Sequence, residues 1–299
     1  MTNNSFIPPL RLIVNSICNG KCEFCHKEGN ITDNCMPETM IFECIQAAEK
    51  VSVSHVAFTG GEPTLRNDLH EIINKVQRQF GRTNISLTTN GCKLKELGEK
   101  IEKPIYSVNL SMTSLDENIA AKYQNVNPQK ALRALEGYPA IHKNLNIVLS
   151  EDNYKEIDAF IAYCKEKGIS MDLMIQAIKN TEYFEIQKEV INKLILYGDS
   201  NIILKSTPSL RINVCEKCVI NVKHPYLNEL FHSNLCDDCG ERKECFEKVC
   251  AVRVHPNGLV TPCLSVNNNV NSENVIDDII RVYANLGKMT FLKKEYENR

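Results

Sequence analysis

The sequence contains no tryptophan, and no apolar run in it is long enough to cross a membrane. Its first residues lack the charged segment followed by an apolar stretch that marks a secretory signal. The formal net charge is -2 over 299 residues, so neither sign is in excess. An excess of positive charge would favour nucleic acid or a membrane surface as the partner. We therefore expect a cytoplasmic protein that acts on neither.

Cysteine, in contrast, is abundant, with 14 residues. In a reducing compartment cysteines serve as metal ligands more often than as disulfides. Three of them, Cys18, Cys22 and Cys25, follow the apolar run 10–14 with C-x3-C-x2-C spacing. Three thiolates on one loop favour zinc or an iron–sulfur cluster. A cluster with four irons normally takes four cysteines, so three would leave one iron open to another ligand. A structural zinc knuckle or three unrelated thiols remain alternatives.

The first two-thirds of the chain alternates strand and helix patterns, which predicts parallel strands covered by helices. Six strands are too few for a full eight-stranded barrel. Polar segments follow several strands, and chemistry in barrel folds lies at the carboxyl ends of the strands. The predicted strands are 10–14, 53–58, 85–89, 105–110, 145–149 and 171–175, and the predicted helices are 36–50, 67–80, 94–101, 128–137, 153–167 and 185–197.

The polar segments at these strand ends are candidates for ligand binding. Glycines permit close backbone approach, and the carboxylate of Glu62 after Gly60 and Gly61 can bind a cationic amine. Thr88-Thr89-Asn90-Gly91 ends the next strand, and Ser111 ends the fourth. Plain turns that use Asn and Gly are the alternative for these segments. If they bind a ligand, we expect them to face one another across the barrel mouth, beside Cys18.

The cysteine spacing with Phe24 before the last cysteine, together with the Gly-Gly-Glu-Pro segment 60–63, resembles the radical S-adenosylmethionine (radical SAM) superfamily. The resemblance implies a partial (β/α)6 TIM-like barrel and a [4Fe-4S] cluster on Cys18, Cys22 and Cys25. It also implies reductive cleavage of S-adenosylmethionine to a 5′-deoxyadenosyl radical, with a reductase or a flavodoxin or ferredoxin as electron donor. The implied cofactor-binding residues are Phe24, Gly60, Gly61, Glu62, Pro63, Thr89, Asn90, Ser111 and Asn146.

The pattern changes near residue 200, so we expect a core barrel at 1–200 and a cysteine-rich domain at 201–299. The C-terminal spacing resembles the twitch and SPASM extensions of radical SAM proteins. That resemblance implies an auxiliary [4Fe-4S] cluster held by Cys236, Cys239, Cys245 and Cys263. The alternative is a zinc ribbon on the two C-x2-C pairs, with a three-cysteine cluster elsewhere. The zinc ligands would be Cys215, Cys218, Cys236 and Cys239, and the cluster ligands Cys245, Cys250 and Cys263.

Within the superfamily, segments 25–29, 60–69 and 251–264 resemble GTP 3′,8-cyclases, which implies a small, nucleotide-like substrate. Ser16 and Ile17 replace the usual Asp-Arg, and the usual Gly-Gly ending is missing, which points to a relative with another substrate. Arg211, Lys223 and Arg253 are candidates for a substrate phosphate or carboxylate, with surface charge as the alternative. Two further hypotheses are a peptide-modifying maturase, against which the barrel's early start argues, and a non-catalytic metal-binding protein.

Overall fold

The computed structural model describes most of the chain. The described residues are 7–22, 25, 35–150, 153–175, 189–203, 209–223, 231–237, 239–240, 249–263, 269–286 and 290–291. In these ranges no helix is both long and apolar enough to span a membrane.

One mixed sheet of eleven strands forms the frame, in the order β12-β11-β1-β2-β3-β4-β5-β6-β9-β8-β7. Neighbours from β1 to β6 pair in parallel, and the sheet does not close on itself. This confirms the predicted partial barrel. The first six strands are β1 Leu10–Ile13, β2 His55–Thr59, β3 Asn84–Thr89, β4 Ile105–Met112, β5 Ala140–Leu149 and β6 Ser170–Ile175.

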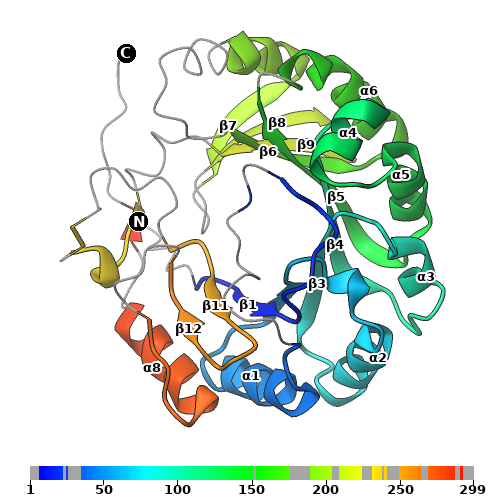
Figure 1. The fold of residues 1–299 in the computed structure, drawn as a ribbon. Coiled ribbons are helices and arrows are strands. Elements are labelled where there is room, and N and C mark those ends of the chain that lie inside the picture. Colours follow the sequence, from blue (N-terminus) through cyan, green and yellow to red (C-terminus); the bar gives the residue numbers. More distant parts are fainter. Residues whose placement is uncertain are drawn as a thin grey trace.

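Helices cover the convex side of the curved sheet, while its concave side faces a central opening (Figure 1). Strand residues alternate between these two sides. Leu12, Phe58, Leu87, Val108 and Leu145 are fully buried toward the helices. The helices are α1 Glu38–Lys50, α2 Leu69–Gln79, α3 Leu94–Gly98, α4 Glu117–Tyr123, α5 Pro128–Gly137, α6 Ile157–Lys167 and α8 Val275–Leu286, with short 3-10 turns at Pro63–Leu65, Tyr154–Glu156, Ile195–Tyr197 and Asn234–Cys236.

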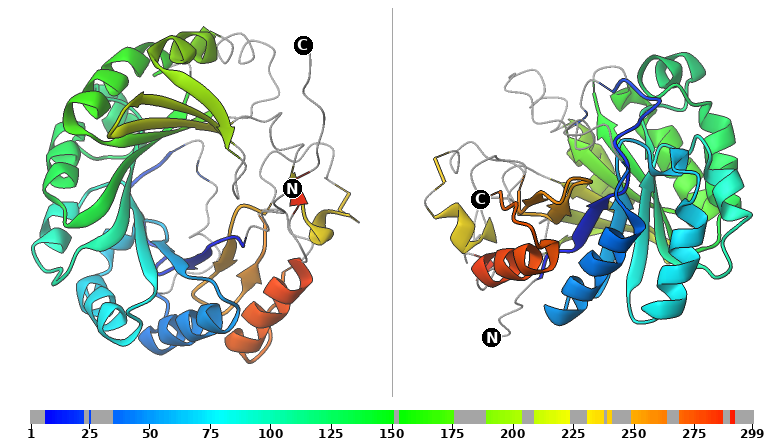
Figure 2. Two further views of the ribbon diagram at one scale, coloured as in Figure 1. Left: turned by 180° about the vertical axis from the view of Figure 1, so that it is seen from behind. Right: turned by 60° about the horizontal axis from the view of Figure 1, so that its bottom comes forward.

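Strands beyond residue 200 extend the sheet at both edges. On one side, β9 pairs in parallel with β6, and β8 and β7 follow in antiparallel pairing. On the other side, β11 pairs in parallel with β1, and helix α8 packs beside α1 (Figure 2). These strands are β7 Asp199–Ile203, β8 Ser209–Cys215, β9 Cys218–Lys223, β11 Val252–Val254 and β12 Val260–Thr261, and β10 Phe231–His232 pairs separately with β13 Thr290–Phe291. The domain boundary near residue 200 stays a prediction.

The six predicted strands agree with the structure except at their ends, most of all in β5, which begins at Ala140 rather than at 145. Of the predicted helix 185–197, residues 189–194 are helical and a 3-10 turn follows. Helix α4 was not predicted, because seven residues give too short a stretch for helical periodicity to be recognised. Its local signal is Asp116, whose side chain caps the first turn by accepting from the backbone of Asn118 and Ile119.

Candidate active site

The cysteine loop leaves β1 at the carboxyl end of the sheet and lies against the end of α4. The backbone N–H of Lys21 donates to the carbonyl of Tyr123 at 2.6 Å, and the Cys22 thiol donates to the same oxygen at 3.5 Å. The amide of Asn19 donates to the carbonyl of Gln124 at 3.4 Å. The unpredicted helix therefore supports the first part of the predicted cluster loop.

The three thiols lie close enough to affect one another electrostatically. Burial, followed by the charges of Cys25 and Cys18, raises the pKa of Cys22 to about 11. Burial also raises the pKa of Cys18, and Glu62 and Cys25 add to that rise, while the backbone N–H of Gly20 opposes it. Cys18 and Cys25 are exposed and Cys22 is partly buried. Without a positively charged ligand, Cys18 and Cys22 thus favour the neutral thiol.

The donor set fits an iron–sulfur cluster better than a single metal ion. Among the described residues, no group of three or more His, Cys, Asp or Glu side chains is arranged to hold one ion. A four-iron cluster binds each cysteine on a different iron, so its ligands stand farther apart than those around one ion. Three accessible thiols that affect one another are compatible with such a cluster. The ligand role of Cys18, Cys22 and Cys25 stays a prediction, and Phe24 lies outside the described residues.

Glu62 is buried at the carboxyl end of β2, with 1% of its surface exposed. One carboxylate oxygen accepts from the Thr64 N–H at 3.0 Å, the Thr64 hydroxyl at 2.6 Å and the Thr89 hydroxyl at 2.5 Å. The other accepts from the Asn90 N–H at 2.6 Å. Burial raises the pKa of Glu62, and these hydrogen bonds act in the opposite direction. The carboxylate therefore joins the ends of β2 and β3, and its predicted contact with a cofactor amine would add to these bonds.

Gly60 and Gly61 lie directly against the backbone that leads to Cys18. An added Cβ on Gly60 would stand 2.3 Å from the Asn15 carbonyl oxygen, and one on Gly61 would stand 2.4 Å from that of Ile17. The Gly61 and Glu62 N–H groups donate to these two carbonyls at 2.9 and 2.8 Å. The close approach that these glycines permit is thus to the cysteine loop itself. Pro63 opens the buried 3-10 turn that follows.

The turn after β3 connects the Glu62 segment with the cysteine loop. The Asn90 side chain donates to the side-chain oxygen of Asn19 at 2.9 Å, and its own oxygen accepts from the Cys92 N–H at 3.0 Å. Gly91 has φ +86, a conformation that glycine adopts without strain. Thr89 and Asn90 thus lie where they were predicted, beside Cys18 and Glu62. Their cofactor contacts remain untested.

Ser111 and Asn146 face the concave side on β4 and β5 and are aligned in register. Both are partly buried. The Ser111 carbonyl accepts from the Gln124 side chain at 2.8 Å, which ties β4 to the end of α4. The Asn146 side-chain oxygen accepts from Asn144 at 2.8 Å. These two candidates lie two and three strands from the β2 segment that carries Glu62.

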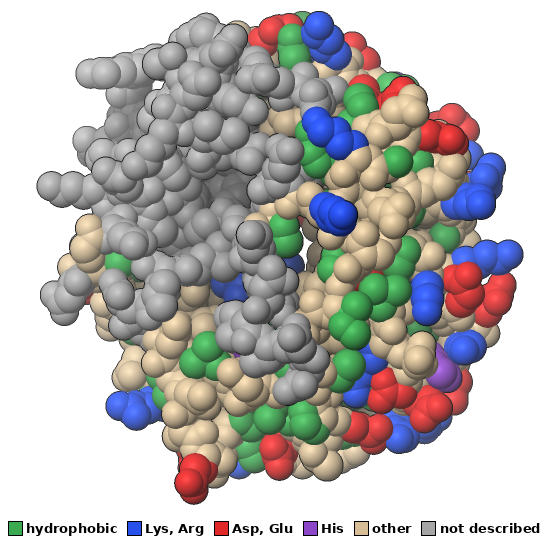
Figure 3. Space-filling model, viewed as in Figure 1, with side chains coloured by type: hydrophobic (Ala, Val, Ile, Leu, Met, Phe, Trp, Pro, Cys, Tyr) green, Lys and Arg blue, Asp and Glu red, His purple; other side chains and the backbone are tan. Residues whose placement is uncertain are grey.

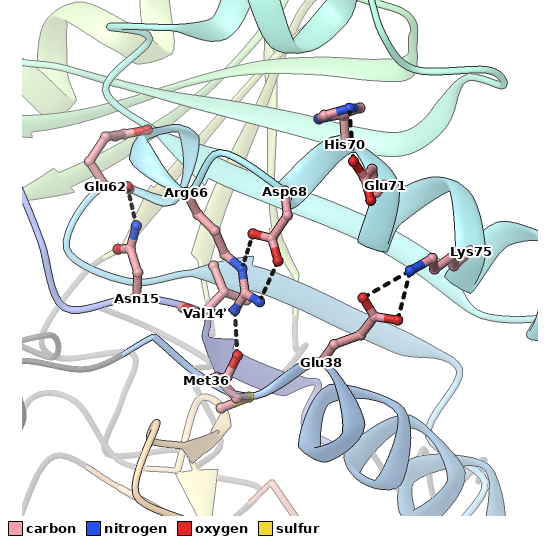
Figure 4. Close-up of polar contacts among 10 residues, drawn as sticks. All are labelled: Val14, Asn15, Met36, Glu38, Glu62, Arg66, Asp68, His70, Glu71 and Lys75. Carbon is pink, nitrogen blue, oxygen red and sulfur yellow. Dashed lines mark hydrogen bonds and ion pairs between the residues drawn. The ribbon is translucent and has the colours of Figure 1, made fainter.

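Arg66 is a supporting residue whose role sequence reasoning did not recognise. Its buried guanidinium donates to the carbonyl of Val14 at 3.0 Å and to that of Met36 at 2.5 Å, so it clasps the two ends of the cysteine-bearing segment (Figure 4). Its other nitrogens donate to both carboxylate oxygens of Asp68, at 2.8 and 3.0 Å. The signal was present in the segment 60–69, where Arg and Asp lie two residues apart.

Arg11 was also missed, although a charged residue inside the apolar run 10–14 is a recognisable signal. It lies directly opposite Arg253 in the β1–β11 pairing. Their neighbours Leu10, Leu12, Val252 and Val254 are buried toward the helices, so both arginines face the concave side. Arg253 is only 2% exposed, so the surface-charge alternative is wrong for it. Two like charges side by side favour a bound anion.

Four of the described C-terminal cysteines lie at opposite edges of the sheet. Cys215 and Cys218 pair across the β8–β9 hairpin at one edge of the sheet. At the other edge, Leu235 and Pro262, the neighbours of Cys236 and Cys263, line one pocket of about 260 Å³ beside α8. Within the described ranges no four-cysteine ribbon is assembled. Cys245 lies outside the described residues, and the predicted auxiliary site with Cys239 stays a prediction.

Comparison with known proteins agrees with the geometry. Residues 12–175 match the family model of the radical SAM superfamily. A probable GTP 3′,8-cyclase of Methanococcus aeolicus is 27% identical over 285 residues, which cover 90% of this chain and 89% of that protein. One of Sulfurisphaera tokodaii is 29% identical over 308 residues, covering 97% and 91%.

Solved structures show the same fold at lower identity. SuiB of Streptococcus suis bound to S-adenosylmethionine has a TM-score of 0.67 and 19% identity, over 95% of this chain and 67% of that one. The enzyme anSMEcpe with bound AdoMet and a peptide has a TM-score of 0.58 and 18% identity, over 94% and 81%. Since the family model matches more than half of the chain, the protein is an enzyme of the radical SAM superfamily, which uses a [4Fe-4S] cluster and S-adenosylmethionine.

Proposed function

We propose that this enzyme abstracts hydrogen from a small, anionic, nucleotide-like substrate held on the concave side of the sheet. The observation that carries the substrate class is the pair Arg11 and Arg253. They are aligned on adjacent strands and lie on the concave side of the sheet, where Arg253 is buried. Paired guanidinium groups suit phosphate, which accepts several hydrogen bonds at once. The relatives named as probable GTP 3′,8-cyclases support a nucleotide-like molecule.

Cys18, Cys22 and Cys25 would hold the cluster at the mouth of the barrel. When bound, the cluster and S-adenosylmethionine supply the electron and the 5′-deoxyadenosyl radical that takes a hydrogen atom from the substrate. The chain's own residues position these groups. Glu62 and Asn90 connect the ends of β2 and β3 to the cysteine loop, and Arg66 holds the base of that loop. A rigid mouth of this kind orients a radical and limits competing reactions.

An auxiliary cluster on the C-terminal cysteines is part of the proposal. Cys236 and Cys263 are partly buried and pack against the core, beside the pocket near α8. Partial burial of thiols at a preformed pocket is compatible with cluster ligation. Zinc at the same cysteines is the alternative, and metal analysis distinguishes the two.

The experiment is iron, sulfide and zinc analysis after anaerobic reconstitution, together with 5′-deoxyadenosine release under strong reductant. We expect about eight irons per chain, falling to about four when Cys18, Cys22 and Cys25 are all replaced by Ala. The exposed Cys35→Ala is the matched control and should change neither number. Absence of iron from the intact protein, or of 5′-deoxyadenosine, would refute the proposed mechanism.

A peptide substrate is the second candidate, because SuiB bound to its precursor peptide SuiA shares the fold with a TM-score of 0.66. The two candidates differ in what Arg11 should do. With a nucleotide, GTP should bind the reconstituted enzyme, and Arg11→Gln should weaken that binding at least about tenfold. If neither the unmodified enzyme nor the Arg11→Gln variant binds GTP or another nucleotide, the nucleotide-like substrate class is wrong.

A further inference from the structure

A row of polar side chains crosses the concave side of the sheet away from the cysteine loop. The register aligns one residue from each of five neighbouring strands, β4, β5, β6, β9 and β8. In order, they are Ser111, Asn146, Asp172, Asn221 and Arg211. The strands on either side of β9 come from parts of the chain that sequence analysis assigned to different domains.

Side-chain hydrogen bonds connect the middle of this row. Asn144 donates to one oxygen of Asp172 at 2.7 Å, and Asn221 donates to the other at 2.7 Å. The side-chain oxygen of Asn221 then accepts from Nε of Arg211 at 3.1 Å. The Asn221 amide is thereby fixed in orientation, because its oxygen and its nitrogen face different partners.

This chain of bonds holds Arg211 by one nitrogen and presents the rest of its guanidinium. In the described part of the protein, Arg211 makes no other hydrogen bond. Its neighbours in the sheet, Leu210 and Ile212, belong to the hydrophobic core on the opposite side. In Figure 3, Lys or Arg side chains lie near the centre of the face seen in Figure 1.

The position of Arg211 relates it to the predicted cofactor contacts. Asn146, a candidate for S-adenosylmethionine, stands in the same row three strands away. Strands lie about 4.8 Å apart, so the two Cα positions are separated by about 14 Å. A molecule of nucleotide size held by Arg211 would therefore reach the neighbourhood of the cofactor.

We propose that Arg211 binds an anionic oxygen pair of the substrate, a carboxylate or a phosphate, and that Asn144, Asp172 and Asn221 are positioning residues for it. This rests on the proposed function, since it places the substrate on the concave side. A guanidinium oriented in advance loses less conformational freedom when it binds two oxygens at once. The wall opposite Arg11 and Arg253 then holds a second anionic point of the substrate.

The test measures how fast phenylglyoxal modifies Arg211 in the reconstituted full chain, followed by mass spectrometry of its peptides. Inorganic phosphate and acetate are added separately as probes. We expect at least one of them to slow modification of Arg211 about fivefold or more, consistent with bidentate binding. Protection by phosphate alone identifies a phosphate site, and protection by acetate identifies a carboxylate site. Arg133, exposed on α5 in the outer layer, is the control and should change less than twofold.

Two variants distinguish a role in positioning Arg211 from a role in the stability of the whole fold. Asp172→Asn keeps the volume of the side chain and Asn221→Leu removes the bond to Arg211, so both should abolish the protection while the melting temperature stays within a few degrees. The proposal would be overturned if neither anion slowed modification of Arg211 more than it slows modification of Arg133. It would also be overturned if Arg211 stayed fully protected in both variants. Release of 5′-deoxyadenosine by the unmodified enzyme is measured separately, so a failed radical mechanism is recognised independently of the anion result.

Discussion

The two walls of the open sheet use polar side chains in different ways. On the β1–β3 wall, Glu62, Asn90 and Arg66 each bond to backbone groups as well as to side chains, so they help to determine where the chain runs. On the β5–β8 wall, Asn144, Asp172 and Asn221 bond to one another, so they determine how side chains point. In the proposed function, the first arrangement would frame the cofactor, and the second would orient a side chain that binds the substrate. Substitutions should therefore cost mainly stability on the first wall and mainly binding on the second.

The largest effect is expected for Arg66→Met on the first wall. It removes the Arg66 donor from the buried carbonyls of Val14 and Met36, and among the described residues only the Val14 carbonyl keeps another bond, from the Met36 N–H at 3.0 Å. The loss should lower the free energy of unfolding by about 3 kcal/mol. Chemical denaturation measures this, and iron content after reconstitution should fall as well. Arg78→Met is the control, because that arginine pairs with Glu102 at the surface and should cost less than about 1 kcal/mol. Equal losses in the two variants would contradict the clasp.

Gly61→Ala should have the next largest effect. Its new Cβ would stand 2.4 Å from a backbone oxygen, so the segment before Cys18 must move. Overpacking of this kind costs about 1–3 kcal/mol, and thermal unfolding should show it. Gly137→Ala adds its Cβ where no atom lies within 4 Å and should change stability little. If both glycines tolerate Ala equally, the loop does not depend on the close approach.

On the second wall, Asn221→Leu should cost only about 1 kcal/mol, because its partners are partly exposed and can turn to water. Denaturant titration gives the value, with the exposed Asn213→Leu on β8 as the comparison. If Asn221→Leu lost more stability than Arg66→Met, the proposed difference between the two walls would be wrong.

The smallest effect concerns pH. The hydrogen bond from Arg66 lowers the pKa of Asp68. A carboxylate with a lowered folded-state pKa stabilises the protein above its unfolded pKa, and this contribution is lost as the pH falls through the folded value. Asp68→Asn should therefore reduce stability by less than about 1 kcal/mol at neutral pH, since Asp68 is half exposed. The difference from the unmodified protein should shrink as the pH falls and disappear below the lowered folded-state pKa of Asp68. A difference that does not shrink with falling pH would exclude the ionised pair as its cause.

Local patterns in the sequence predicted most of the first wall, apart from the roles of Arg11 and Arg66. The apolar runs 10–14 and 53–58, and the segments that follow them, predicted both the strands and the meeting of the Cys18 loop with Glu62 and Asn90. These residues follow their strands directly, so parallel pairing brings them to one edge. The family resemblance predicted which of these residues bind the cluster and the cofactor. No local pattern alone distinguishes such residues from those of ordinary turns.

The second wall could not be predicted from local patterns. Asn221 reaches Asp172, and Arg211 reaches Asn221, only because β8 and β9 pair beside β6, with 33 residues or more between β6 and these strands. Such pairing depends on which strand edge remains open, and periodicity carries no information on that. Arg253 lies opposite Arg11 for the same kind of reason, across an even longer stretch of chain.

The Arg66 clasp has a consequence for the order of assembly. By joining Val14 to Met36, it closes the cysteine segment into a ring as soon as the parallel strands have paired. Closing a loop of about twenty residues costs roughly 3 kcal/mol of chain entropy, and the frame meets that cost before any iron arrives. In the proposed function, cluster insertion would then be a late step on a finished scaffold, and a cluster destroyed by oxygen could be rebuilt without unfolding the barrel.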